Sequence, residues 1–79
     1  MMDERKDRAT RAIIWMGERI AEGRTVYLTQ YASRIEITPK LWARFEKAGK
    51  ALFRASSDGL YIARGKQWDY VGYHRVSAI

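Results

Sequence analysis

The chain has 79 residues, with 15 Lys and Arg against 9 Asp and Glu, which gives a net charge of +6. This length is typical of a single domain with a small core, and the absence of cysteine excludes disulfides, thiolate metal ligands and cysteine nucleophiles. No apolar run approaches the ~20 residues of a membrane-spanning helix, and the charged N-terminus lacks the apolar segment of a signal peptide. We therefore expect a cytoplasmic protein, either a monomer or a small homo-oligomer.

Residues 3–22 are predicted to form an amphipathic helix that ends near Gly23. Acidic residues precede basic ones by four positions in two pairs, which favours the helix further. The predicted buried stripe consists of apolar residues three or four positions apart, namely Ala9, Ile13, Met16 and Ile20. Trp15 lies one position away from this stripe, so it either widens the core face or anchors a dimer.

Residues 25–29 and 34–37 alternate apolar and polar side chains and contain several β-branched residues, so both segments are predicted strands. The connection from Gln30 to Ser33 is a predicted loop, and the two strands then form a hairpin.

Thr38 and Pro39 are typical of a helix start, because a hydroxyl caps the first turn and proline fits the first helical position. The predicted helix ends near residue 48, before Gly49. Its expected buried face is Leu41, Trp42, Phe45 and Ala48, and its expected outer face is Lys40, Arg44, Glu46 and Lys47.

Three further strands are predicted at residues 51–55, 60–64 and 67–76, with Asp58 and Gly59 in a turn and Gly72 at a bulge. The predicted order is α-β-β-α-β-β-β. We expect an α+β fold over residues 1–79, a small single domain whose antiparallel sheet has two helices packed on one face.

A winged helix-turn-helix is the alternative fold. It requires a short helix at residues 28–34, with residues 38–48 as the recognition helix and residues 51–64 as the wing. The strand-like alternation of residues 34–37 opposes it, and so does the inward position of Leu41, Trp42 and Phe45.

The sequence offers no recognisable catalytic, metal or cofactor site. His74 is the only histidine, the serines occur in no nucleophile motif, and the carboxylates have no metal-ligand or glycosidase spacing. His74 is expected at the surface near a strand end. We therefore expect a protein that is not an enzyme, with no cofactor and no metal.

Basic and aromatic residues alternate through the last two thirds of the chain, a pattern that suits nucleic acid or a protein that handles nucleic acid. A purely structural interpretation places most of the aromatic residues in the core and assigns the arginines to solubility. Because one sheet face cannot bury the aromatics on both sides of the last strand, at least one of Trp68, Tyr70 and Tyr73 is expected to be exposed. The candidate binding residues are Arg54, Arg64, Lys66, Trp68, Tyr70 and Tyr73.

Several segments of residues 25–71 resemble short uncharacterised proteins encoded by phages and prophages: residues 25–31, 37–42, 48–54 and 58–61. Small proteins of that origin without an enzyme signature include anti-CRISPR inhibitors, which are alike in size and role more than in sequence. The resemblance implies a protein that binds a CRISPR effector complex and blocks target DNA binding, and it assigns no residue roles. A direct DNA- or RNA-binding regulator is the alternative function.

Overall fold

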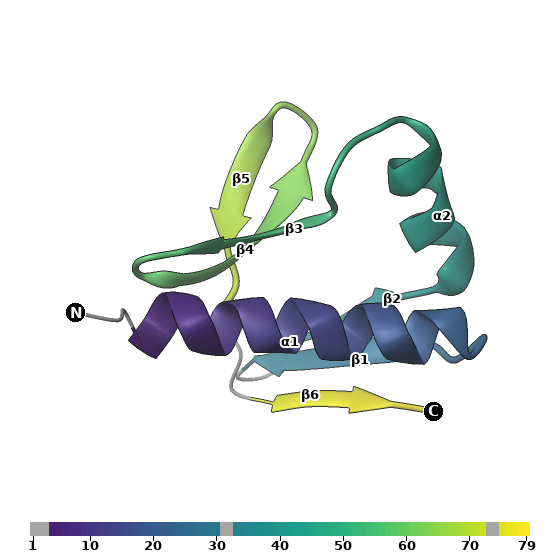
Figure 1. Ribbon diagram of the computed structural model, residues 1–79, viewed down its shortest axis with the longest axis horizontal. Coiled ribbons are helices and arrows are strands. Elements are labelled where there is room, and N and C mark those ends of the chain that lie inside the picture. Colours follow the sequence, from purple (N-terminus) through teal and green to yellow (C-terminus); the bar gives the residue numbers. More distant parts are fainter. Residues whose placement is uncertain (1–3, 31–32, 73–74) are drawn as a thin grey trace.

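The computed structural model describes residues 4–30, 33–72 and 75–79 of the chain. Within these residues two helices and six strands are formed, and the strands make two antiparallel sheets in the orders β2-β1-β6 and β3-β4-β5. The first helix lies between the two sheets (Figure 1). The elements are α1 Glu4–Ala21, β1 Val26–Gln30, β2 Ser33–Ile37, α2 Pro39–Lys47, β3 Phe53–Ser56, β4 Gly59–Arg64, β5 Gln67–Tyr70 and β6 Arg75–Ala78.

Helix α1 supplies the apolar surface on which both sheets pack. Its stripe follows the predicted periodicity, with Ala9, Met16 and Ile20 buried. Trp15 is half-buried and packs against the same core, so it widens the core face of the helix. The guanidinium carbon of Arg19 lies 5.3 Å from the centroid of the Trp15 ring. A widened apolar face allows one helix to contact a sheet on each side.

The predicted hairpin of β1 and β2 is formed, and it excludes the winged helix-turn-helix. Residues 28–30 and 33–34, which that alternative needs as a helix, are strand residues. Gln30 and Ser33, expected in the loop, instead face each other as the last described pair of the ladder. The inner side chains of this sheet, Val26, Leu28 and Ile37, are buried in the core, and β1 and β6 contact α1.

Helix α2 begins as predicted but is buried less than predicted. The Leu41 N–H donates to the Thr38 hydroxyl over 3.1 Å, and Pro39 occupies the first turn. No residue of α2 is fully buried: Trp42 and Phe45 pack half-buried against the core, and Ala48 is exposed. A Cβ atom on Gly17 of α1 would lie 3.3 Å from the Trp42 ring, so this glycine allows the close approach of the indole.

The expectation of one sheet with both helices on one face is wrong, because the last predicted strand divides in two. Strand β5 ends at Tyr70, Gly72 has a φ of 60°, and the chain resumes at Arg75 as β6 in the other sheet. Gly72, predicted at a bulge within one strand, instead lies between two strands of different sheets, with a left-handed φ that is accessible mainly to glycine. The α+β class and the predicted order of elements are confirmed, with β5 and β6 in place of one strand.

Candidate binding surface

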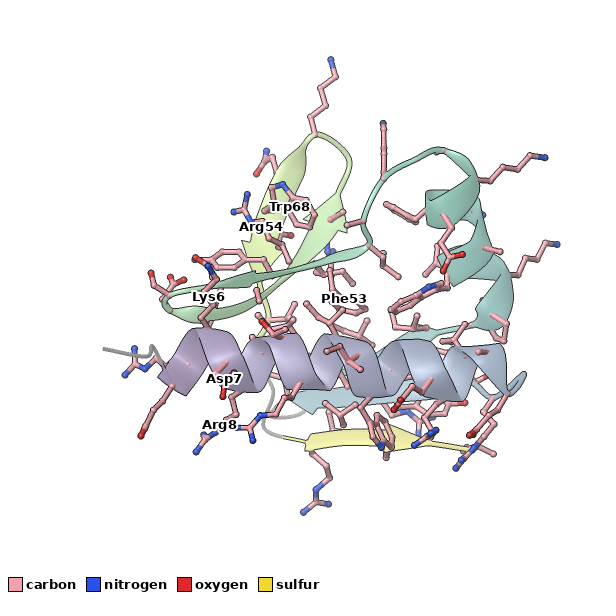
Figure 2. All side chains as sticks on the ribbon, viewed as in Figure 1. Lys6, Asp7, Arg8, Phe53, Arg54 and Trp68 are labelled. Atoms are coloured by element: carbon pink, nitrogen blue, oxygen red, sulfur yellow. The ribbon has the colours of Figure 1, made fainter. Side chains whose placement is uncertain are left out.

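The outer face of the β3-β4-β5 sheet carries a cluster of one arginine and three aromatic rings, which we call the aromatic face: Arg54, Tyr61, Trp68 and Tyr70. Arg54 is paired across the ladder with Tyr61, and Tyr61 with Tyr70. The guanidinium carbon of Arg54 lies 4.8 Å from the Trp68 ring centroid and 5.5 Å from that of Tyr61. Figure 2 shows Arg54 and Trp68 side by side on this sheet. Cation–π attraction therefore holds the arginine over two rings.

The tyrosines of the aromatic face are held by contacts at the β3–β4 turn. The Tyr61 and Tyr70 rings meet edge to face, with centroids 5.4 Å apart, and the Tyr61 hydroxyl donates to Oδ2 of Asp58 over 2.5 Å. This hydrogen bond lowers the pKa of Asp58 and raises the pKa of Tyr61. Tyr70 lies over Gly59 and is 55% exposed, which confirms that part of the aromatic pattern faces solvent.

A groove of about 580 Å³ separates α2 from the turn that joins β4 to β5. Its basic side chains are Arg44, Lys50 and Lys66, and its aromatic ones are Phe45 and Trp68, which also belongs to the aromatic face. We call this hollow the basic groove. Among the residues that the structure describes, none of the three cations has a carboxylate within 4.0 Å, and none of the groove's lining residues is acidic.

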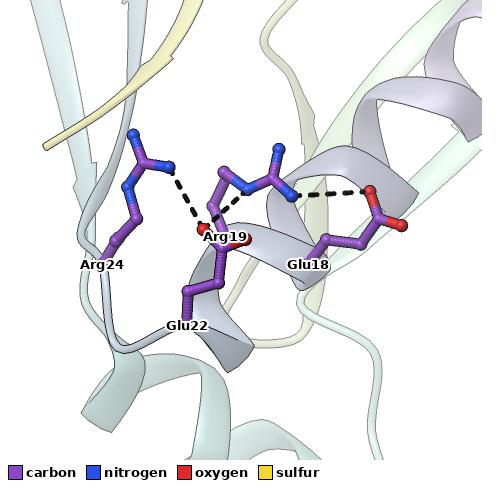
Figure 3. A network of polar contacts seen from close by, with 4 residues as sticks. All are labelled: Glu18, Arg19, Glu22 and Arg24. Atoms are coloured by element: carbon purple, nitrogen blue, oxygen red, sulfur yellow. Dashed lines mark hydrogen bonds and ion pairs between the residues drawn. The ribbon is translucent and has the colours of Figure 1, made fainter.

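The charges at the C-terminal end of α1, in contrast, compensate one another (Figure 3). An oxygen of Glu22 lies 3.1 Å from Nη1 of Arg24 and 3.0 Å from Nε of Arg19, and Glu18 lies 3.9 Å from the same Arg19 side chain. The Arg19 contact is an ion pair outside hydrogen-bond geometry. The hydrogen bond from Arg24 is the main cause of a lowered pKa at Glu22. This cluster therefore satisfies its own charges.

Three of the six candidate residues chosen from the sequence come together on the aromatic face: Arg54, Trp68 and Tyr70. Lys66 lies in the adjoining turn and lines the basic groove. Arg64 alternates to the opposite side of β4, where its Nε lies 3.3 Å from Oδ2 of Asp69. Tyr73, like His74, lies outside the described residues.

The groove adds three residues to the six candidates: Arg44, Phe45 and Lys50. The sequence predicts Arg44 on the outer face of a helix and Phe45 on its buried face, and it places Lys50 in no predicted helix or strand. The groove forms because residues 44–51 and 63–68 approach each other across the fold. The one signal in the sequence was the basic character of this half of the chain.

The part of the chain that the structure describes holds no group of three or more His, Asp or Glu side chains placed to bind a metal ion. Neither of its two helices is long and apolar enough to cross a membrane.

Comparison of the chain with protein-family models, curated proteins and solved structures finds no match.

Proposed function

We propose that this is a non-enzymatic binding protein that docks its aromatic face and basic groove onto an acidic surface of a protein complex. One observation carries the proposal: three cations without acidic partners among the described residues adjoin an arginine–aromatic cluster in which Arg54 and Tyr70 are exposed. Arginine, tryptophan and tyrosine are the residues that most often dominate the energy of protein interfaces. Because Arg54 is already held over two rings, docking would cost less side-chain entropy than for a free arginine.

The partner that we propose is a CRISPR effector complex in the host cytoplasm, and the activity is anti-CRISPR inhibition. The resemblance to short phage and prophage proteins supports this choice. An inhibitor bound to an acidic patch beside the DNA channel would block target DNA sterically, without any chemical step.

The experiment measures binding of labelled target DNA by purified effector complexes as the protein is added. We expect the wild-type chain to prevent DNA binding by at least one complex and Tyr70→Ser to do so about tenfold less well, which corresponds to about 1.4 kcal/mol of docking energy. The matched control is Ile14→Ser, because Ile14 on α1 is exposed to 57% against 55% for Tyr70. Unimpaired DNA binding by every complex, with no association, would contradict the proposal.

Direct binding of nucleic acid is the second candidate. It is favoured by the cations of the basic groove, which have no carboxylate partner among the described residues. Two observations make it the weaker one. The winged helix-turn-helix is not formed, and Arg54 lies over the Trp68 and Tyr61 rings, where bases would otherwise stack. The test is the affinity of the protein for labelled random duplex DNA, measured across a series of salt concentrations. Tight binding with a steep negative salt slope would make nucleic acid the direct ligand and displace the first proposal.

A further inference from the structure

We infer that the basic groove receives an acidic peptide segment of the partner, with one large apolar side chain between carboxylates. The inference rests on the proposed function in taking its ligand from a protein. The two parts of the surface have different ligands: the aromatic face packs on the surface of the partner, and the groove binds an extended segment of its chain.

The apolar part of the ligand follows from the apolar residues that line the groove. Phe45 of α2 and Trp68 of β5 line the hollow together with Ala48, Ala51 and Ala63, so much of its lining is carbon surface. A volume of about 580 Å³ falls within the ~300–1,000 Å³ of typical ligand sites and exceeds what a single surface side chain needs. A large apolar side chain of the partner would bury its surface here and expel water from both rings.

The acidic part follows from where the cations lie. Arg44 extends from α2, Lys50 follows that helix, and Lys66 comes from the β4–β5 turn on the opposite wall. Cations on both walls match carboxylates on both sides of a central apolar residue. None of these cations has a carboxylate partner among the described residues, so docking breaks no described ion pair.

A peptide fits the groove better than a phosphate group does. Phosphate sites favour helix N-termini, where free N–H groups and the positive end of the helix dipole meet the anion. The groove instead lies along the C-terminal half of α2, lined by Arg44, Phe45 and Ala48, where the dipole is negative. Singly charged carboxylates are repelled less there than a phosphate dianion. A second copy of this chain is opposed by its own charge of +6.

The test is fluorescence anisotropy at low salt, with a labelled peptide in which one phenylalanine is flanked by glutamates. Two comparison peptides replace the glutamates by glutamines or the phenylalanine by glycine, and oligothymidylate serves as the nucleic-acid probe. The groove variants are Lys66→Glu, which reverses the charge of a lining residue, and Ala51→Trp, which places a large side chain at an exposed lining position without changing charge. Lys47→Glu makes the same charge change on α2 outside the groove and is the matched control. Circular dichroism confirms that each variant folds.

We expect the acidic phenylalanine peptide to bind more tightly than both comparison peptides, and Lys66→Glu and Ala51→Trp each to weaken it about tenfold. Lys47→Glu should change the affinity less than twofold. Tighter binding of oligothymidylate, equal binding of the glutamine peptide, an equal loss with Lys47→Glu, or no binding at all would each overturn the inference. Peptide binding without any effect on effector complexes would instead contradict only the proposed function.

Discussion

The two sheets share one architecture and differ in what their outer faces offer. Each is a three-stranded antiparallel sheet with an apolar inner face on α1, and each holds an arginine over a tyrosine. In β2-β1-β6 the guanidinium carbon of Arg34 lies 4.5 Å from the Tyr27 ring centroid, and Tyr27 is paired across the ladder with Glu36. In β3-β4-β5 the pair of Arg54 and Tyr61 is joined by two more aromatic rings and adjoins the basic groove. Both sheets carry an arginine–aromatic pair, so such a pair alone does not mark a candidate site. What distinguishes β3-β4-β5 is the neighbouring hollow, whose cations have no carboxylate partner in the part of the chain that the structure describes.

The largest expected effect is a loss of stability on mutation of the core that the two sheets share. Leu28 of β1 is 2% exposed and Leu60 of β4 is fully buried, and both side chains belong to one core. Leu28→Ala and Leu60→Ala should each lower the free energy of unfolding by about 2–5 kcal/mol, through lost burial and a cavity. Denaturant unfolding followed by fluorescence and by circular dichroism should show one coincident transition for each variant. Separate transitions for the two sheets would show that α1 does not unite them.

A smaller effect is expected at the turn that supports Tyr70. Gly59 has a φ of +133°, and a Cβ atom there would lie 2.9 Å from Cε1 of Tyr70. Gly59→Ala should destabilise the protein by about 1–3 kcal/mol and displace the ring. Gly23→Ala is the matched control, because Gly23 has a φ of +82° but nothing within 4 Å of the added Cβ. Thermal unfolding should show the larger loss at Gly59, and equal losses would mean that backbone strain alone matters.

The smallest expected effect is a pH dependence of stability that arises from the hydrogen bond between Tyr61 and Asp58. The Asp58 hydrogen bond raises the pKa of Tyr61 above its ordinary value of 10.0, so its contribution to stability is present below pH 10 and is lost as the pH rises further. For Asp58, whose pKa is lowered from 3.8, the contribution is present above that value and is lost in acid. Asp58→Asn should move the last tyrosine ionisation, followed by ultraviolet absorbance, to lower pH. An unchanged titration curve would show that the hydrogen bond does not persist in solution.

How much of this was predictable from the sequence depended on whether the signal was local. Thr38 and Pro39 predicted the start of α2, and the stripe of α1 predicted its buried face, because caps and periodicity act within a few residues. The second sheet was missed because only pairing with β1 reveals that β6 is a separate strand. Because side chains alternate between the two faces of a strand, the register of the sheet places Arg64 on the face opposite to Arg54 and Tyr70. The basic groove depends on segments that meet only in the folded chain.

The comparison of the two sheets is tested most directly by reversing one arginine on each. Arg54→Glu and Arg34→Glu make the same change of charge at exposed positions, each beside a tyrosine ring. The measurement is the concentration of each variant that half-blocks target DNA binding by an effector complex that the wild-type chain inhibits. We expect Arg54→Glu to raise this concentration about tenfold or more and Arg34→Glu to change it less than twofold, with both variants folded. Equal losses would mean that net charge alone governs docking, and no loss with Arg54→Glu would contradict the assignment of the aromatic face.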